Sequence, residues 1–136
     1  MALRKFDSVE LGDDLPEVHA DVRMSTVRRF TRATNMRASR FTDHEASKKQ
    51  GLPGAIVPGI MSQGMLAALI HNWAPGCRVR KLDAIFRSHL LVDSNPICQG
   101  VVTDTDESNR CVEIDLTIAN EQGETAVLGT ATVELG

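Results

Sequence analysis

The stretch Pro58-Gly59-Ile60-Met61-Ser62-Gln63-Gly64-Met65-Leu66-Ala67-Ala68-Leu69-Ile70-His71-Asn72-Trp73 carries the clearest structural signal in the chain. Its pattern predicts a helix from about Ile60 to Trp73, which Ala74-Pro75-Gly76 brings to an end. Large apolar side chains cover most of the circumference of this helix (Ile60, Met61, Met65, Leu66, Leu69, Ile70 and Trp73). A helix that is apolar nearly all round is a buried helix, so we expect the rest of the chain to wrap around it.

The residues after this helix alternate between apolar and polar, as β-strands do. Three such faces can be read in order (Leu82, Ala84 and Phe86; then Val112, Ile114, Leu116 and Ile118; then Val127, Gly129, Ala131, Val133 and Leu135). Polar turns from Asp104 to Asn109 and from Asn120 to Gly123 suit hairpins. We therefore expect an α+β fold in which an antiparallel sheet wraps around one long central helix.

The first half of the chain predicts shorter elements. Gly12-Asp13-Asp14 has the composition of a turn, and Pro16 begins a short extended stretch. A helix is expected from about Thr26 to Thr34, capped by Ser25, with Val27, Phe30 and Ala33 on one face. A second, short helix follows Thr42-Asp43-His44-Glu45, which has the form of a capping box, and Gly51 is placed to end it.

Composition narrows the functional classes. A chain of 136 residues is one domain, 1–136, by the usual length prior. Three cysteines at wide spacing (Cys77, Cys98 and Cys111) predict reduced thiols, and scattered histidines predict no metal site. We expect a cytoplasmic protein, because the start lacks the apolar run of a signal peptide and the apolar stretch Met65–Ile70 is too short to span a bilayer. We also expect no cofactor.

The net charge of −3 conceals an uneven distribution. Residues 23–50 hold eight basic and two acidic side chains, a net charge of +6, whereas the remainder carries −9. This basic segment is either a solvated helix face or a docking surface for an anion such as a nucleotide phosphate or an acidic carrier protein. The overall negative charge and the few aromatic residues (four Phe, one Trp, no Tyr) argue against nucleic-acid binding.

The order of elements resembles the hot-dog fold, and local motifs resemble the MaoC-like family of (R)-specific enoyl-CoA hydratases and 3-hydroxyacyl-thioester dehydratases. Gly51-Leu52-Pro53-Gly54-Ala55-Ile56-Val57-Pro58-Gly59-Ile60 is similar to the family's Gly-[Phe/Leu]-Pro-Gly-x-Ile-Val-His-Gly-Met. The spacing of Val9, Gly12-Asp13 and Leu15-Pro16 is also close to the family's, and Phe86-Arg87 resembles the start of its next long strand. The Gly-Asp that usually follows is missing at Asp93-Ser94-Asn95.

The family's hydratase motif reads Gly-Asp-x-Asn-Pro-[aliphatic]-His, and its Asp and His activate a water for addition to an enoyl thioester. Counting forward from Phe30 places the Asp position at Met36, and counting back from Ser47 and Gly51 places the His position at Phe41. Neither Met36 nor Phe41 can exchange a proton. The chain is thus expected to lack catalytic residues for hydration by the usual mechanism.

Other positions are candidates for a remaining role. Asp43 and His44 are the acid–base pair nearest the motif; because capping explains Asp43, His44 alone is kept as a substitute for the lost dyad. The resemblance implies that backbone amides at Gly59 and Ile60 polarise a thioester carbonyl, although Gly59 could instead serve only to turn the chain after Pro58. Ser62 and Gln63 are either a polar spot at the substrate tunnel or ordinary helix residues. No carboxylate occurs between Ala55 and Asn72, which argues against a thioesterase.

Three functions agree with the resemblance. The first is a MaoC-like subunit that binds an acyl-CoA or acyl-carrier thioester of lipid metabolism, either as a homodimer or as a hetero-oligomer with a catalytic MaoC-like chain. Its phosphates or carrier would be held by Arg28, Arg29, Arg40 and Arg87. The second is an enzyme that reuses the pocket for isomerisation, cyclisation or elimination, and the third is a non-catalytic acyl-CoA-binding regulator.

Overall fold

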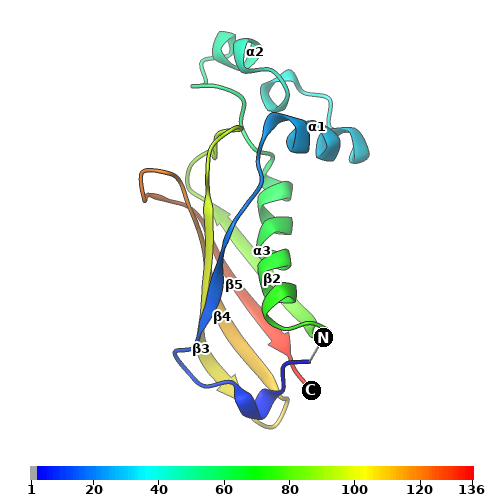
Figure 1. Cartoon of the computed structure of the whole chain (residues 1–136), viewed down its shortest axis with the longest axis vertical. Helices are drawn as coiled ribbons and strands as arrows, with labels where there is room; N and C mark the ends of the chain where they lie inside the picture. The colour runs from blue at the N-terminus through cyan, green and yellow to red at the C-terminus, as the bar shows by residue number, and fades with distance from the viewer. Residues whose placement is uncertain (1–2) are drawn as a thin grey trace.

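The computed structural model describes residues 3–136. A five-stranded antiparallel sheet, in the order β1-β3-β4-β5-β2, curves around the long helix α3 (Figure 1). The strands are β1 (Asp14–His19), β2 (Arg78–Phe86), β3 (Ile97–Asp106), β4 (Cys111–Ala119) and β5 (Thr125–Glu134). The helices are α1 (Met24–Ala33), α2 (His44–Lys49) and α3 (Gly59–Trp73), with single 3₁₀ turns η1 (Phe6–Ser8) and η2 (Ser39–Phe41). The predicted α+β hot-dog architecture is confirmed.

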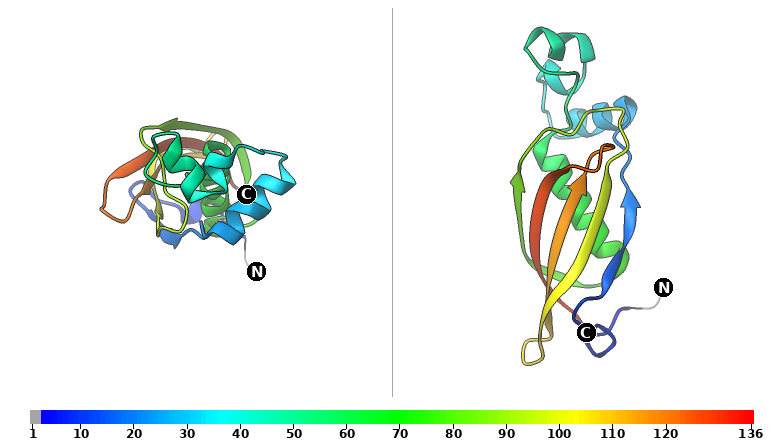
Figure 2. Two further views of the ribbon diagram at one scale, coloured as in Figure 1. Left: turned by 90° about the horizontal axis from the view of Figure 1, so that it is seen from above. Right: turned by 90° about the vertical axis from the view of Figure 1, so that its left-hand side faces the viewer.

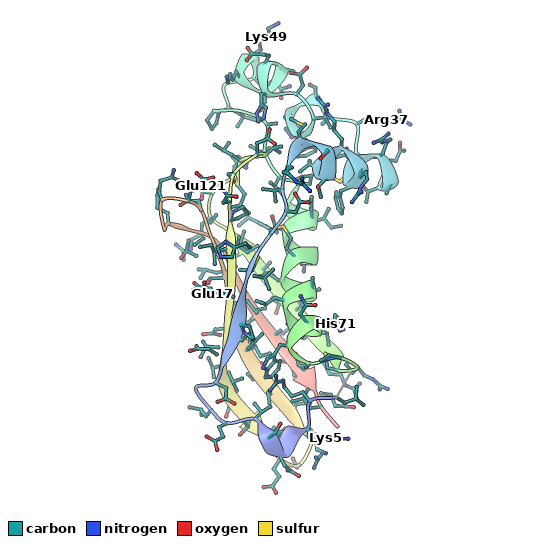
Figure 3. All side chains as sticks on the ribbon, viewed as in Figure 1. Lys5, Glu17, Arg37, Lys49, His71 and Glu121 are labelled. Atoms are coloured by element: carbon teal, nitrogen blue, oxygen red, sulfur yellow. The ribbon has the colours of Figure 1, made fainter. Side chains whose placement is uncertain are left out.

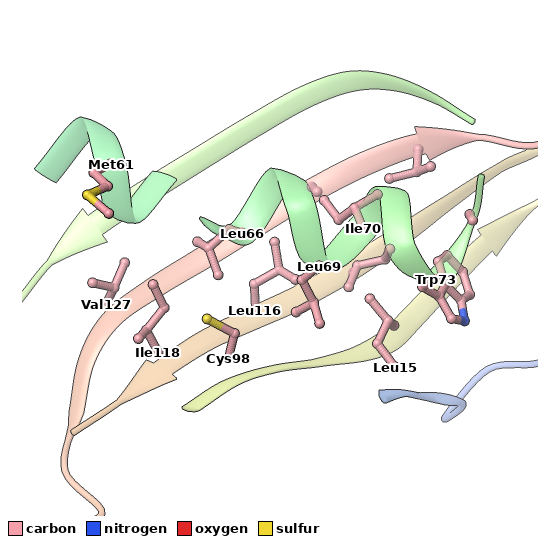
Figure 4. Packing of buried hydrophobic residues seen from close by; sticks show 14 of the residues in the cluster. Leu15, Met61, Leu66, Leu69, Ile70, Trp73, Cys98, Leu116, Ile118 and Val127 are labelled. Carbon is pink, nitrogen blue, oxygen red and sulfur yellow. The ribbon is translucent and has the colours of Figure 1, made fainter. Parts of the chain in front are cut away.

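The core lies between α3 and the concave face of the sheet, as Figure 4 shows. Leu66, Leu69 and Ile70 from α3 are at most 1% exposed, and they face the fully buried residues of the three inner strands (Cys98, Val102, Val112, Ile114, Leu116, Ile118, Val127 and Val133). The helix approaches β5 closely because Gly129 has no side chain: a Cβ there would lie 3.0 Å from Leu66 Cδ1 and 3.3 Å from the carbonyl oxygen of Asp83. Cys98 is a small core residue, and burial raises the pKa of its thiol to about 11.

Three details of the predicted elements were wrong. Helix α1 begins at Met24, with Arg23 as its N-cap, so Ser25 lies inside the helix and does not cap it. Its buried positions are Val27 and Thr31, one turn apart, whereas Ala33 is exposed. Strand β3 runs through Asp106, so residues 104–106 belong to the strand; Asp106 pairs with Cys111 across a turn that is shorter than predicted.

Residues 23–50, with α1, η2 and α2, form a compact unit that we call the helical cap. The cap sits over the Gly59 end of α3, at the opposite end of the molecule from the N- and C-terminal segments (Figures 1 and 2). Figure 3 shows Arg37 and Lys49 on the outside of the cap, far from Lys5. Within residues 3–136, no helix combines the length and the apolar character needed to cross a membrane.

Candidate functional site

A hollow of about 260 Å³ lies where the cap, the start of α3 and the end of β2 meet. The residues that line it come from η2, the segment before α3, the first turn of α3, the end of β2 with the segment after it, and β5 (Arg40, Phe41, Ile56, Val57, Gly59, Ser62, Phe86, Ser88, His89, Leu90 and Val127). Most of these side chains are apolar, and four are polar. A largely apolar concave site with a few polar groups is the usual form of a small-molecule site.

Two extended segments form one wall of the hollow. The amide of Val57 donates to the carbonyl of Leu90 at 2.8 Å, and the amide of Val92 donates to the carbonyl of Ala55 at 2.9 Å. Ile56 pairs with Leu91 in an antiparallel bridge between these two hydrogen bonds. The same register places His89 opposite Pro58, the residue immediately before α3.

The start of α3 borders the hollow at Gly59 and Ser62. The amides of Met61 and Ser62 donate to the carbonyl of Pro58, at 3.0 and 3.1 Å. The amides of Gly59 and Ile60 belong to the first turn, whose N–H groups have no acceptor within the helix. Ser62 lines the hollow although the residue is only 3% exposed. Free amides, the helix dipole and a buried hydroxyl together favour a partly negative oxygen at this position.

The two motif positions lie in different places. Phe41 is 7% exposed and its ring lines the hollow, with the guanidinium of Arg40 4.7 Å from the ring centroid. Met36 instead lines a separate hollow of about 280 Å³ within the cap, between α1 and Thr42. The two hollows have no lining residue in common. Positions 36 and 41 thus line different hollows.

His44 has a structural environment of its own, outside the lining of the hollow. Its Nδ1 accepts a hydrogen bond from the amide of Ala55 at 3.0 Å, so the proton of the neutral ring is on Nε2, which lies 2.9 Å from Asp93 Oδ2. Asp93 Oδ1 also accepts from the amide of Met24 at 2.8 Å. The hydrogen bond from His44, and then the one from Met24, lower the pKa of the Asp93 carboxyl. This network ties α2, the start of α1 and the segment after β2 together.

The remaining candidates divide between the hollow and the surface. Gly59, Ser62 and Arg40 line the hollow. Ile60 is 61% exposed on the outer side of α3, and the Gln63 side chain donates to the carbonyl of Leu82, which joins α3 to β2. Among the cationic candidates, Arg28, Arg29 and Arg87 are all exposed, and Arg28 donates two hydrogen bonds to the carbonyl of Thr42.

His89 and Ser88 are polar residues of the hollow that the sequence analysis did not select. Neither belongs to a motif, and both follow the last residue of β2, where the chain bends and the amides of Arg87 and Ser88 share the carbonyl of Ala126. The sequence offers one signal for His89, namely a histidine among polar residues directly after a predicted strand. Only the folded structure brings it to the border of the hollow, where it also lines a second hollow with Leu91.

No family model and no curated protein matches this sequence. Solved structures do match it in shape. The (R)-hydratase from A. caviae involved in PHA biosynthesis aligns with a TM-score of 0.89 and 18% identity over 95% of this chain and 98% of that one. The ChsH1–ChsH2 complex from Mycobacterium tuberculosis aligns with a TM-score of 0.85 and 16% identity over 93% and 98% of the two chains. A MaoC-like dehydratase gives 0.91 and 22%, over 98% of this chain and 43% of that one.

These likenesses show the fold. The chain has the hot-dog fold of MaoC-like dehydratases and (R)-hydratases, as its motifs predicted. Identities of 16–22% carry no residue-by-residue assignment of activity. A shared fold does not fix a function, which resides in the residues of the hollow.

Proposed function

We propose that this chain binds an acyl thioester in the hollow at the start of α3. It would do so as a subunit of a hydratase- or dehydratase-type assembly in which this chain, and not the whole assembly, lacks the usual acid–base dyad. One observation carries the proposal: Gly59, in the first turn of α3, and the buried residue Ser62 line a hollow whose other side chains are mostly apolar. A thioester joins a polar carbonyl to an apolar chain, so it matches both parts of this lining.

The carbonyl oxygen would accept hydrogen bonds at the start of α3, as in an oxyanion hole. The adjoining acyl carbons would contact Phe41, Val57, Leu90 and Val127. Arg40 lines the hollow and also belongs to the basic helical cap. The cap would therefore meet the phosphates of CoA, or an acidic carrier protein, as they approach the hollow.

A partner chain is the second part of the proposal. Ile60, Ile85 and Phe86 are 61, 63 and 51% exposed, and the ring of Phe86 lies beside Gly59 at the edge of the hollow. Strand β2 is an edge of the sheet, with an unpaired side that is available to another strand. A second hot-dog chain on this edge would cover these side chains and close the hollow. One of the similar structures, the ChsH1–ChsH2 complex, is an assembly by its name.

Calorimetry with crotonyl-CoA and a hydration assay on the same sample test the binding proposal. We expect saturable binding and negligible hydration, because general acid–base catalysis supplies about 10²–10⁴-fold and Phe41 cannot provide it. A purified chain that hydrates crotonyl-CoA rapidly would contradict the loss of the dyad, and a chain that does not bind the thioester would contradict the proposal as a whole. Native mass spectrometry of the chain from its own host tests the partner.

Two variants examine the lost dyad. Phe41→His places an imidazole in the hollow, and we expect it to give weak hydration of crotonyl-CoA. Adding Met36→Asp should give little more, because position 36 lines the separate hollow of the cap. A large gain from the double variant over Phe41→His would show that positions 36 and 41 act as one unit.

The second candidate function is a different reaction in the same hollow. It is favoured by His89, an acid–base side chain in the lining that does not depend on positions 36 and 41.

A further inference from the structure

We propose that His89 is a proton-transfer residue that acts on the carbon next to the carbonyl of a thioester bound at the start of α3. The substrate class is a 3-enoyl thioester, whose double bond His89 would move by one carbon. This inference rests on the proposed thioester binding, and it adds a reaction to it.

The placement of His89 follows from the ladder beside α3. Val57 with Leu90, and Ala55 with Val92, fix the register by hydrogen bonds of 2.8 and 2.9 Å. His89 is therefore opposite Pro58, one residue before the free amide of Gly59. His89 lines the hollow beside Gly59, and it also lines a neighbouring hollow of about 180 Å³ together with Leu91. A carbonyl oxygen held by Gly59 would bring its neighbouring carbon close to this wall.

The chemistry of the lining singles out His89. The polar side chains that line the hollow are a guanidinium, two hydroxyls and this imidazole, from Arg40, Ser62, Ser88 and His89. Imidazole is the one group among them that gains and loses a proton near neutral pH. His44 shows the contrasting case, because both of its ring nitrogens are engaged, by Ala55 and Asp93. The His89 ring forms no hydrogen bond to any other part of residues 3–136.

One base is sufficient for the proposed step. Neutral His89 takes a proton from C2 of the 3-enoyl thioester, and the electron pair of the C2–H bond extends the conjugation onto the carbonyl oxygen. The amides of Gly59 and Ile60 and the hydroxyl of Ser62 stabilise the resulting dienolate. The imidazolium then returns a proton to C4, which leaves a 2-enoyl thioester and neutral His89. Atoms and charge balance without an oxidant, a reductant or a second acid.

The 3-enoyl class is favoured by the same reasoning. Its C2 protons are acidified by both the carbonyl and the double bond, so a single imidazole with no carboxylate beside it can remove them. Hydration would need water held and activated in addition, and no residue of the lining supplies a second acid–base group. The hollow is thus better matched to an internal proton shift than to water addition.

The experiment uses the full chain, 3-hexenoyl-CoA and D₂O. Deuterium uptake and formation of the 2-enoyl product are followed by mass spectrometry, and affinity by calorimetry. We expect His89→Gln to lower both rates by about 10²-fold or more while the affinity is retained. His71→Gln is the matched control, because His71 is an exposed histidine near the far end of α3. His89 is itself exposed, so both variants should melt at the temperature of the natural sequence.

The outcomes separate the two proposals. Binding without any proton shift, or a shift that His89→Gln leaves unchanged, overturns the role of His89 and leaves the proposed thioester binding intact. A failure to bind the CoA thioester overturns both. A shift that falls with His89→Gln, but not with His71→Gln, and at unchanged affinity, supports the inference.

Discussion

The helical cap and the body of helix and sheet are held together in different ways. In the body, α3 and the inner strands bury large aliphatic side chains against one another, and Leu66, Ile70, Ile114 and Ile118 are fully inaccessible. In the cap, the fully buried Ser47 bonds the carbonyl of Gly54, and the exposed groups of His44 and Asp93 bond backbone amides across segments. The body thus depends on area removed from water, whereas the cap combines a few buried apolar side chains, such as Val27, with particular hydrogen-bonding atoms.

This difference explains where function can reside. Such a core tolerates aliphatic exchanges that conserve volume, so the body provides a rigid support. The cap and the segments that join it to the body set the position of Phe41 through its own backbone hydrogen bond and that of His89 through those of its neighbours Ser88 and Leu90. Small changes there can alter the chemistry of the hollow while the fold is kept.

The largest expected effect is a loss of body packing. Leu66→Ala should lower the free energy of unfolding by about 2–5 kcal/mol, because Leu66 is 0% exposed and packs directly over Gly129. Urea denaturation measures the change. Leu11→Ala, at a 68% exposed position, is the control and should stay within about 0.5 kcal/mol of the natural sequence. Similar losses for both variants would contradict the contrast between core and surface.

The second-largest expected effect comes from removing a single hydroxyl group of the helical cap. Ser47→Ala should cost about 1–3 kcal/mol, since it removes the hydrogen bond from Ser47 Oγ to the carbonyl of Gly54 and leaves that carbonyl buried. We expect amide hydrogen exchange to rise in the cap and in residues 51–56 before it rises in the sheet. Ser25→Ala, on the exposed side of α1, serves as the matched variant. Uniform loosening of the whole chain would show that cap and body unfold as one unit.

The third effect concerns the charge of the cap. Arg40→Glu should weaken binding of a CoA thioester about fivefold, which corresponds to about 1 kcal/mol. The difference should shrink at high salt, because exposed charges are screened. Arg78→Glu, at the start of β2 near the far end of α3, changes the net charge equally and should leave the affinity unaltered. Equal weakening by both variants would mean that overall charge, and not the cap, attracts the ligand.

The sequence predicts the body better than the site, for a physical reason. The burial of α3 can be read from its own residues, because an apolar circumference has one stable environment. The alternation in β4 and β5 likewise marks the inner face without knowledge of the partner strands. The start of α1 was misplaced because the Arg23 side chain does not cap the helix. The amides of Arg23 and Met24 instead donate to the carboxylates of Asp21 and Asp93, which lie outside the helix.

The hollow was predictable only in part. Gly59, Ser62 and Phe41 belong to segments whose motifs drew attention to them. His89 was missed because it becomes a site residue through pairing with Pro58, thirty-one positions earlier, and neither residue shows this alone. The resemblance also suggested one site for positions 36 and 41, yet the local geometry sends Met36 into the cap after the left-handed residue Asn35 (φ 56°).

The smallest expected effect tests the electrostatic tie between cap and body. Asp93→Asn removes the charge and keeps a residue that tolerates the left-handed backbone at this position (φ 67°). The side chain is 47% exposed, so screening limits the loss to less than about 1 kcal/mol. Because the hydrogen bond from His44 lowers the pKa of Asp93 in the folded state, its contribution is complete above the ordinary carboxyl pKa of about 4 and is lost as the pH falls through the folded value.

Thermal melting from pH 7 down to pH 2 measures that contribution. The difference in melting temperature between the natural sequence and Asp93→Asn should be constant near neutral pH and should disappear below about pH 4. Asp115→Asn, which removes an exposed carboxylate from the outer face of β4, should show no such gap. A gap that widened on acidification would mean that the carboxyl is stabilised in its neutral form. The negative charge of Asp93 would then contribute nothing to the tie, and the side-chain hydrogen bonds of Ser47 and His44 would remain to join the cap to the segment before α3.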